Sequence, residues 1–178
     1  MGNCYQNPSN NDGNTEIKNN QAAKQGSNAD SVFINEALKA HNKYRQKHGA
    51  PNLTINPDLC FYSQEWANYL ANNNTFDHSN CQWNNDVVGE NIAMCSGQVM
   101  TGKFMTDMWY NEISDYDFKN PGFTGGTGHF TQVVWKGSKE LGVGVAQARD
   151  GTYYAVANYY PAGNDVDSFP KNVFPPSN

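Results

Sequence analysis

Two stretches of the sequence decide the fold: Gly128-His129-Phe130-Thr131-Gln132-Val133-Val134-Trp135 and, nearer the C-terminus, Tyr159-Tyr160-Pro161-Ala162-Gly163-Asn164. The first stretch follows a loop rich in glycine and aromatic residues, and it predicts a short helix over 129–135. The second follows a run of aromatic and small apolar residues that predicts a strand over 153–160.

More strands are predicted around the second stretch. Bulky apolar residues alternate with glycine or alanine over 141–146, which predicts a strand with one face small enough for close approach of a neighbouring element. Asp150-Gly151 predicts the hairpin turn into the strand over 153–160, and a further strand is predicted over 87–94. Helices packed on a small antiparallel sheet give the α+β class, with an αβα sandwich as the expected layering.

Three helices are predicted ahead of the short one. Apolar residues at helical spacing begin at Phe33, and Asn56 followed by Pro57 predicts the start of the second helix. Thr101 is the expected N-cap of the third helix, whose inner face carries Glu112. A carboxylate among core residues is costly unless a partner satisfies it.

The composition divides the chain into a tail and one domain. Residues 1–30 are polar with almost nothing to bury, which predicts a disordered, lipidated tail before a domain at 31–178. The net charge of −5 argues against nucleic acid as a partner, and no apolar run is long enough to span a bilayer. Residues 1–31 hold no apolar signal-peptide core, so we expect no export, with mostly free thiols among the four cysteines.

The N-terminus carries an acylation signal. Met1-Gly2-Asn3-Cys4 places a glycine for myristoylation beside a cysteine for palmitoylation, although Gln6 stands where the motif prefers Ser or Thr. One myristoyl chain binds membranes only marginally, whereas two lipids hold stably. The sequence has no polybasic cluster to act as the second signal, so Cys4 is expected to serve.

Four residues are candidates for a functional site: His78, Glu90, Glu112 and His129. Two imidazoles and two carboxylates are the right types for a zinc site with open positions, or for acid–base catalysis. The alternative is a hydrogen-bonded polar network that holds loops together. The residues by themselves do not decide between these possibilities.

The surrounding motifs resemble those of the CAP superfamily, which includes the plant pathogenesis-related proteins. In family order they are Phe76-Asp77-His78-Ser79, Gly89-Glu90-Asn91-Ile92, Trp109-Tyr110-Asn111-Glu112 and Gly128-His129-Phe130-Thr131-Gln132. The resemblance runs from about Phe33 to the C-terminus. It implies that the four candidate residues line one cleft, which can bind a divalent metal, expected to be Zn²⁺, through His78 and His129.

Further stretches, including 40–49 and 120–124, resemble a Golgi-associated branch of this family. That resemblance implies an N-myristoylated protein on the cytosolic face of the Golgi or plasma membrane that binds anionic lipids and forms homodimers. It also implies a loop that contacts lipid or protein partners and carries Phe118, Phe123 and Phe130.

Three functions follow as hypotheses. The leading one is a non-enzymatic, membrane-associated protein that binds sterol, fatty acid or anionic phospholipid, protein partners, or both. The second is a zinc-dependent hydrolase that uses Glu90 or Glu112 as general base, although the sequence has no His-Glu-x-x-His motif. The third is a secreted, extracellular defence-type CAP protein, against which the composition of residues 1–31 weighs.

Overall fold

The central layer is a four-stranded sheet with the strand order β1-β5-β6-β4. The computed structural model describes residues 23–177, in which the sheet strands are β1 (Thr54–Ile55), β4 (Gly89–Cys95), β5 (Glu140–Gln147) and β6 (Tyr153–Tyr160). The β4–β6 and β5–β6 pairs are antiparallel as predicted, but β1 runs parallel to β5, so the sheet is mixed. A strand of two residues has no alternating pattern, which is why the sequence did not reveal β1.

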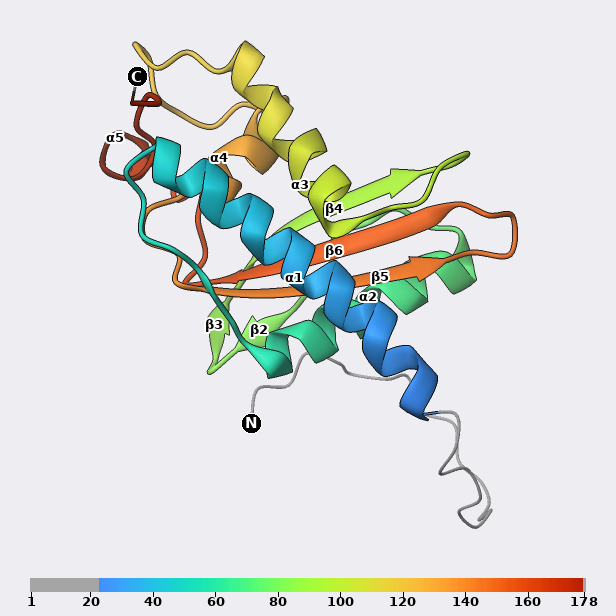
Figure 1. Ribbon diagram of the computed structural model, residues 1–178. Helices are drawn as coiled ribbons and strands as arrows, with labels where there is room; N and C mark the ends of the chain where they lie inside the picture. Colours follow the sequence, from blue (N-terminus) through green and yellow to red (C-terminus); the bar gives the residue numbers. More distant parts are fainter. Residues whose placement is uncertain (1–22, 178) are drawn as a thin grey trace.

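Helices cover both faces of the sheet, which confirms the predicted αβα sandwich (Figure 1). One face is covered by α2, and the other by α1, α3 and α4. A separate ribbon of two short strands, β2 and β3, precedes β4. The bounds of the remaining elements are α1 (Ala23–Lys47), α2 (Pro57–Asn73), β2 (Gln82–Trp83), β3 (Asp86–Val87), α3 (Gly102–Tyr110), the 3-10 helix η1 (Asn111–Asp115), α4 (Gly128–Val134) and α5 (Phe169–Asn172).

The contact between α2 and the sheet depends on glycine. A Cβ on Gly142 would lie 2.2 Å from the carbonyl carbon of Leu59, and one on Gly144 would lie 2.4 Å from the Cα of Gln64. The close approach that the sequence pattern predicted is therefore confirmed. Gln64 uses this proximity, because its side chain pairs with both the N–H and the carbonyl of Val145.

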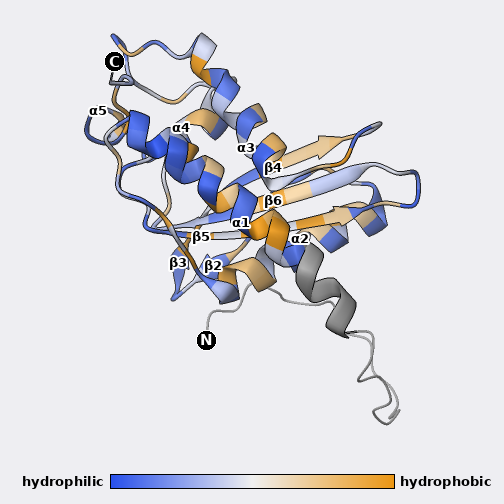
Figure 2. Cartoon of the chain, in the orientation of Figure 1, coloured by the Kyte–Doolittle hydropathy of each residue, from blue (hydrophilic) through white to orange (hydrophobic). Residues whose placement is uncertain are grey.

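The opposite face of the sheet carries the main apolar core. Side chains from α1, α3 and α4 pack there against residues of β5 and β6, and Figure 2 shows that the helices carry both apolar and polar residues. Members of this core with no exposed surface include Ala37, Met105, Phe130, Val133, Leu141 and Tyr159.

The predicted helix starts are confirmed at two positions. The Asn56 side chain accepts the N–H groups of Asp58 and Leu59, and the Thr101 hydroxyl accepts that of Phe104. The first helix begins at Ala23, ahead of the apolar residues at helical spacing that start at Phe33.

Two further predictions concern localisation. Cys60 and Cys95 carry free thiols, which confirms the prediction for these two residues, whereas Cys81 is disulfide-bonded, which contradicts it there. Along residues 23–177 no helix is both long and apolar enough to cross a membrane. The acylation candidates Gly2 and Cys4 lie outside the described residues.

Candidate functional site

Glu112 joins the end of α3 to the start of α4. Its Oε2 accepts the backbone N–H groups of His129 (3.0 Å) and Phe130 (3.1 Å), and its Oε1 lies 2.6 Å from His129 Nδ1. The two N–H groups belong to the first turn of α4, where a helix leaves its backbone donors without intrahelical partners. These hydrogen bonds offset the predicted cost of burying the Glu112 carboxylate. Glu112 itself lies in η1 and not, as predicted, in the third α-helix.

Glu90 forms a second histidine–glutamate pair. Its Oε1 lies 2.7 Å from His78 Nδ1 and accepts the Ser79 N–H at 2.8 Å, while its Oε2 accepts the Ser79 hydroxyl. The Glu90 side chain is 7% exposed and that of His78 60% exposed. The hydrogen bond to Glu90, more than any other influence, raises the pKa of His78 above its ordinary value.

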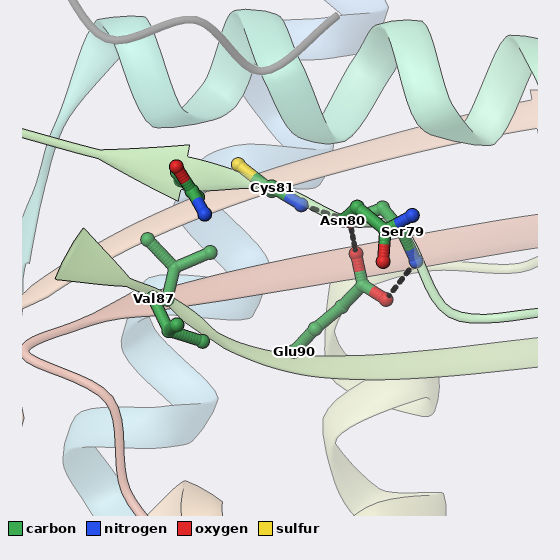
Figure 3. A pocket seen from close by; sticks show the side chains of 7 residues that line it. Ser79, Asn80, Cys81, Val87 and Glu90 are labelled. Atoms are coloured by element: carbon green, nitrogen blue, oxygen red, sulfur yellow. Dashed lines mark hydrogen bonds between the residues drawn. The ribbon is translucent and has the colours of Figure 1, made fainter. Parts of the chain in front are cut away.

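A small pocket of about 160 Å³ lies beside Glu90 (Figure 3). The Glu90 carboxylate points across it to Ser79, and the short strands β2 and β3 contribute to its wall. Neither histidine of the candidate site lines this pocket.

The two pairs lie on opposite sides of the edge strand β4. Side chains alternate along a strand, so Glu90 and Asn91 point to different faces of the sheet. Asn158, the partner of Glu90 in β6, donates to Ser63 of α2, which places Glu90 on the α2 side. Asn91 points to the other side and donates to the His129 carbonyl at 3.1 Å. The structure thus assembles the four predicted residues as two pairs connected through β4.

A buried chain of hydrogen bonds extends from Asn91 to α1. Asn91 also donates to the Tyr159 hydroxyl, which lies 2.8 Å from His41 Nε2. His41 Nδ1 lies 2.8 Å from the Ala37 carbonyl, and the ring has no exposed surface. His41 is therefore a hydrogen-bonded core histidine.

The glycines of the motifs make room for Gln132. A Cβ on Gly89 would lie 2.1 Å from Gln132 Oε1, and one on Gly163 would lie 2.7 Å from Gln132 Nε2. Gln132 Oε1 accepts the Gly163 N–H and Nε2 donates to the Ser138 hydroxyl. Gln132 therefore joins β4, α4 and the segment after β6, which explains why both positions are glycine.

Asn164 completes this framework. It adopts a positive φ of 61°, accepts the Thr131 hydroxyl at 2.7 Å and donates to the Gly128 carbonyl at 2.9 Å. Sequence reasoning did not assign roles to Gln132, Asn164 or Asn91, although all three stand inside the quoted motifs. Only Asn164 directly follows a glycine, Gly163, which was the available signal for that residue.

Within residues 23–177 the candidate residues do not gather into a group of three metal ligands. Among residues 23–177, no three His, Cys, Asp or Glu side chains lie close enough to share one metal ion. Each imidazole directs its Nδ1 to a carboxylate, which leaves one ring nitrogen on each histidine. Catalytic zinc takes three protein ligands and structural zinc four, so His78 and His129 by themselves supply fewer protein ligands than either kind of site, and Zn²⁺ binding by this pair stays a prediction.

The predicted lipid-contact loop is only partly available at the surface. Phe130 is fully buried, and Phe118 packs against Tyr116 and Phe130. Phe123 is 58% exposed and lies over Gly128, whose added Cβ would come within 3.0 Å of its ring. Phe130 is therefore a core residue and not a lipid contact, because helical spacing in α4 turns it inward.

His48 connects the C-terminal segment to the core. It is buried, with Nδ1 2.6 Å from the Phe174 carbonyl and Nε2 3.0 Å from the Tyr110 hydroxyl. Its burial lowers its pKa. The side chain thus holds the C-terminal segment against α1 and α3.

Comparisons with known proteins agree with this architecture. Residues 38–159 match the family described as CAP, the cysteine-rich secretory protein family. The chain is 48% identical over 153 residues to Golgi-associated plant pathogenesis-related protein 1 of Homo sapiens, covering 85% of this chain and 98% of that protein. It is 32% identical over 148 residues to secreted protein RBT4 of Candida albicans, covering 80% of this chain and 38% of that protein.

Solved structures share the fold. The crystal structure of NaASP2 with Zn²⁺ aligns with a TM-score of 0.62 at 24% identity, covering 82% of this chain and 86% of that chain.

Proposed function

The chain belongs to the cysteine-rich secretory protein (CAP) family, and from this premise we propose that it is a non-enzymatic binding protein attached to membranes. Its ligands are lipids of the sterol, fatty acid or anionic phospholipid classes, together with protein partners. Similarity to a Golgi-associated protein along nearly all of that protein's length supports a location on the cytosolic face of the Golgi or plasma membrane.

The observation that carries the proposal is how the two glutamates are used. Glu112 accepts two backbone N–H groups as well as an imidazole, and Glu90 accepts the N–H and hydroxyl of Ser79 as well as an imidazole. A general base needs a lone pair directed at substrate, whereas these oxygens are directed at the protein's own donors. Both carboxylates therefore have a structural role. Glu90 holds the loop at Ser79 in place, and Glu112 holds the start of α4.

The zinc-hydrolase alternative has less support. It requires one glutamate to ligate the metal while the other acts as base, but both are engaged in the same type of backbone contact. Secretion is the competing hypothesis for where the protein is located, because secreted protein RBT4 is among the relatives.

Acylation is the first test of the proposal. In eukaryotic cells supplied with a clickable myristate analogue, we expect label on the wild-type chain and none on Gly2→Ala. Membrane association should weaken in both Gly2→Ala and Cys4→Ser, because a single acyl chain binds membranes only marginally. Unlabelled chain recovered from the medium, or glycosylated at Asn52 or Asn73, would instead place the protein in the secretory route.

Phe123 is the loop residue that we expect to enter a membrane. Replacing it with serine should weaken binding of the acylated chain to sterol-containing liposomes about 10-fold or more, since burial of one large apolar side chain contributes roughly 1.5–3 kcal/mol. Co-sedimentation measures the effect. Phe61→Ser is the matched control, because Phe61 is 62% exposed but lies on α2, on the far side of the sheet. Equal losses in the two variants would contradict a specific role for Phe123.

A further inference from the structure

The exposed side of α1 carries a row of lysines. Lys39, Lys43 and Lys47 follow one another at intervals of four residues, and all three are exposed. Residues four apart lie on the same side of a helix, so the row extends roughly 12 Å along the axis at 1.5 Å per residue. In Figure 2 the C-terminal half of α1 is coloured mostly hydrophilic.

A fourth lysine comes from the neighbouring helix. Lys103 of α3 lines the same groove of about 320 Å³ as Lys39 and Lys43. We name these four residues, Lys39, Lys43, Lys47 and Lys103, the lysine face. It is formed by two segments that lie about sixty residues apart in the sequence and come together only in the fold.

Most of the charge on this face is not neutralised. Lys103 pairs with Asp107, but within residues 23–177 none of the three lysines of α1 forms an ion pair. The Lys47 ammonium lies 5.5 Å from the centre of the Tyr44 ring, which leaves its charge in place. Glu36 is the other carboxylate that lines the groove. A locally positive face on a chain of net charge −5 requires an explanation.

We infer that the lysine face is a second membrane-binding signal, and that it contacts the headgroups of anionic phospholipids in a bilayer. This inference rests on the proposed function. A myristoyl chain becomes a stable anchor when a basic patch assists it, and each lysine near an anionic surface contributes about 1 kcal/mol. The acylation motif precedes α1, the helix that carries three of the four lysines, in the same chain.

The residue types favour a bilayer over a single bound molecule. The face contains lysines and no exposed arginine; an ammonium acts as a point charge, whereas arginine supplies a planar fork that recognises one phosphate bidentately. A row parallel to a helix axis suits a surface of mobile headgroups. It does not form an enclosed cradle.

The test compares two double variants of the full-length, N-myristoylated chain. Lys39→Gln/Lys43→Gln removes two charges from the lysine face, and Lys139→Gln/Lys171→Gln removes two from exposed positions outside α1, α3 and the loop that carries Phe123. The net charge is the same in both. Binding is measured by co-sedimentation with vesicles of phosphatidylcholine alone and of phosphatidylcholine containing about a third phosphatidylserine, at low and high salt, after circular dichroism confirms folding.

We expect wild type to prefer the phosphatidylserine vesicles. The lysine-face variant should bind them about 30-fold more weakly, the control variant should change less than about 3-fold, and high salt should remove most of the difference. Equal losses in the two variants, with wild type still bound, would overturn the inference alone. Equal binding of wild type to both vesicle types would also overturn it, and would direct attention to an acidic protein partner. Absence of wild-type binding to any vesicle would overturn the proposed function as well.

Discussion

Replacing Arg45 with methionine is expected to lower the free energy of unfolding by about 3–5 kcal/mol. Arg45 has no exposed surface, and its guanidinium donates to the carbonyls of Pro51, Val133, Trp135 and Ser138 at 2.7–3.1 Å. Methionine fills much of the volume but donates nothing, so these buried acceptors lose their partners. Chemical denaturation at neutral pH measures the loss.

The acceptors explain why the position holds an arginine. Val133 and Trp135 lie at the C-terminal end of α4, where helix carbonyls lack intrahelical partners and carry partial negative charge. Burial lowers the pKa of Arg45 to about 10, which still leaves the side chain charged at neutral pH. The charge therefore fastens α1 to the helix that carries His129.

Two further variants make this prediction specific. Arg45→Lys keeps the charge but places its donors on a single nitrogen, so it should recover only part of the loss. Gln46→Ala, at the exposed neighbouring position, should change the stability by less than about 0.5 kcal/mol. An Arg45→Met chain within about 1 kcal/mol of wild type would show that the network of carbonyls is not a major source of stability.

Acidification is expected to destabilise the protein through His41. Burial lowers the pKa of His41 from 6.5 to about 4. As the pH falls below 6.5 the unfolded chain takes up a proton at this residue and the folded chain does not. The contribution of His41 to the free energy of unfolding is therefore present above pH 6.5 and is lost progressively towards pH 4. Between pH 7.5 and 4.5 this one residue should remove about 2.5 kcal/mol of unfolding free energy.

The comparison that isolates this effect is His41→Gln. Glutamine offers a donor and an acceptor but does not titrate, so the variant should lose about 2.5 kcal/mol less than wild type between the two pH values. His48, whose pKa burial also lowers, is present in both chains and cancels in the difference. Urea denaturation curves at pH 7.5 and 4.5 provide the four free energies. If both chains lose the same amount, His41 is not the group that responds.

Much of the fold could be predicted because it depends on local chemistry. An asparagine side chain can accept the first N–H groups of the helix that follows it, so asparagine before a helical pattern predicts a helix start. Asn56 does this at the start of α2. Alternation of glycine with valine along β5 likewise predicted which face a helix approaches. The four site residues were recognised from their motifs, but their arrangement as two pairs on either side of β4 was not, since alternation along one strand does not reveal what packs on each face.

Other features were invisible because their partners lie far away in the sequence. Nothing in the sequence around Arg45 indicates its partners, which are carbonyls about ninety residues away. Nothing in the sequence around His48 indicates that the C-terminal segment returns to cover it. The hydropathy of Phe130 was equally consistent with a surface contact or a core position, and only packing in α4 distinguished them.

By itself the sequence determined the family, the helix starts, the hairpin of β5 and β6, and the identity of the histidines and glutamates, because each is written in contiguous residues or short motifs. Only the tertiary structure decided that the glutamates hold backbone donors, that an arginine joins α1 to α4, and that lysines of two helices form one face. The physical reason is that burial and electrostatic environment depend on which distant segments meet.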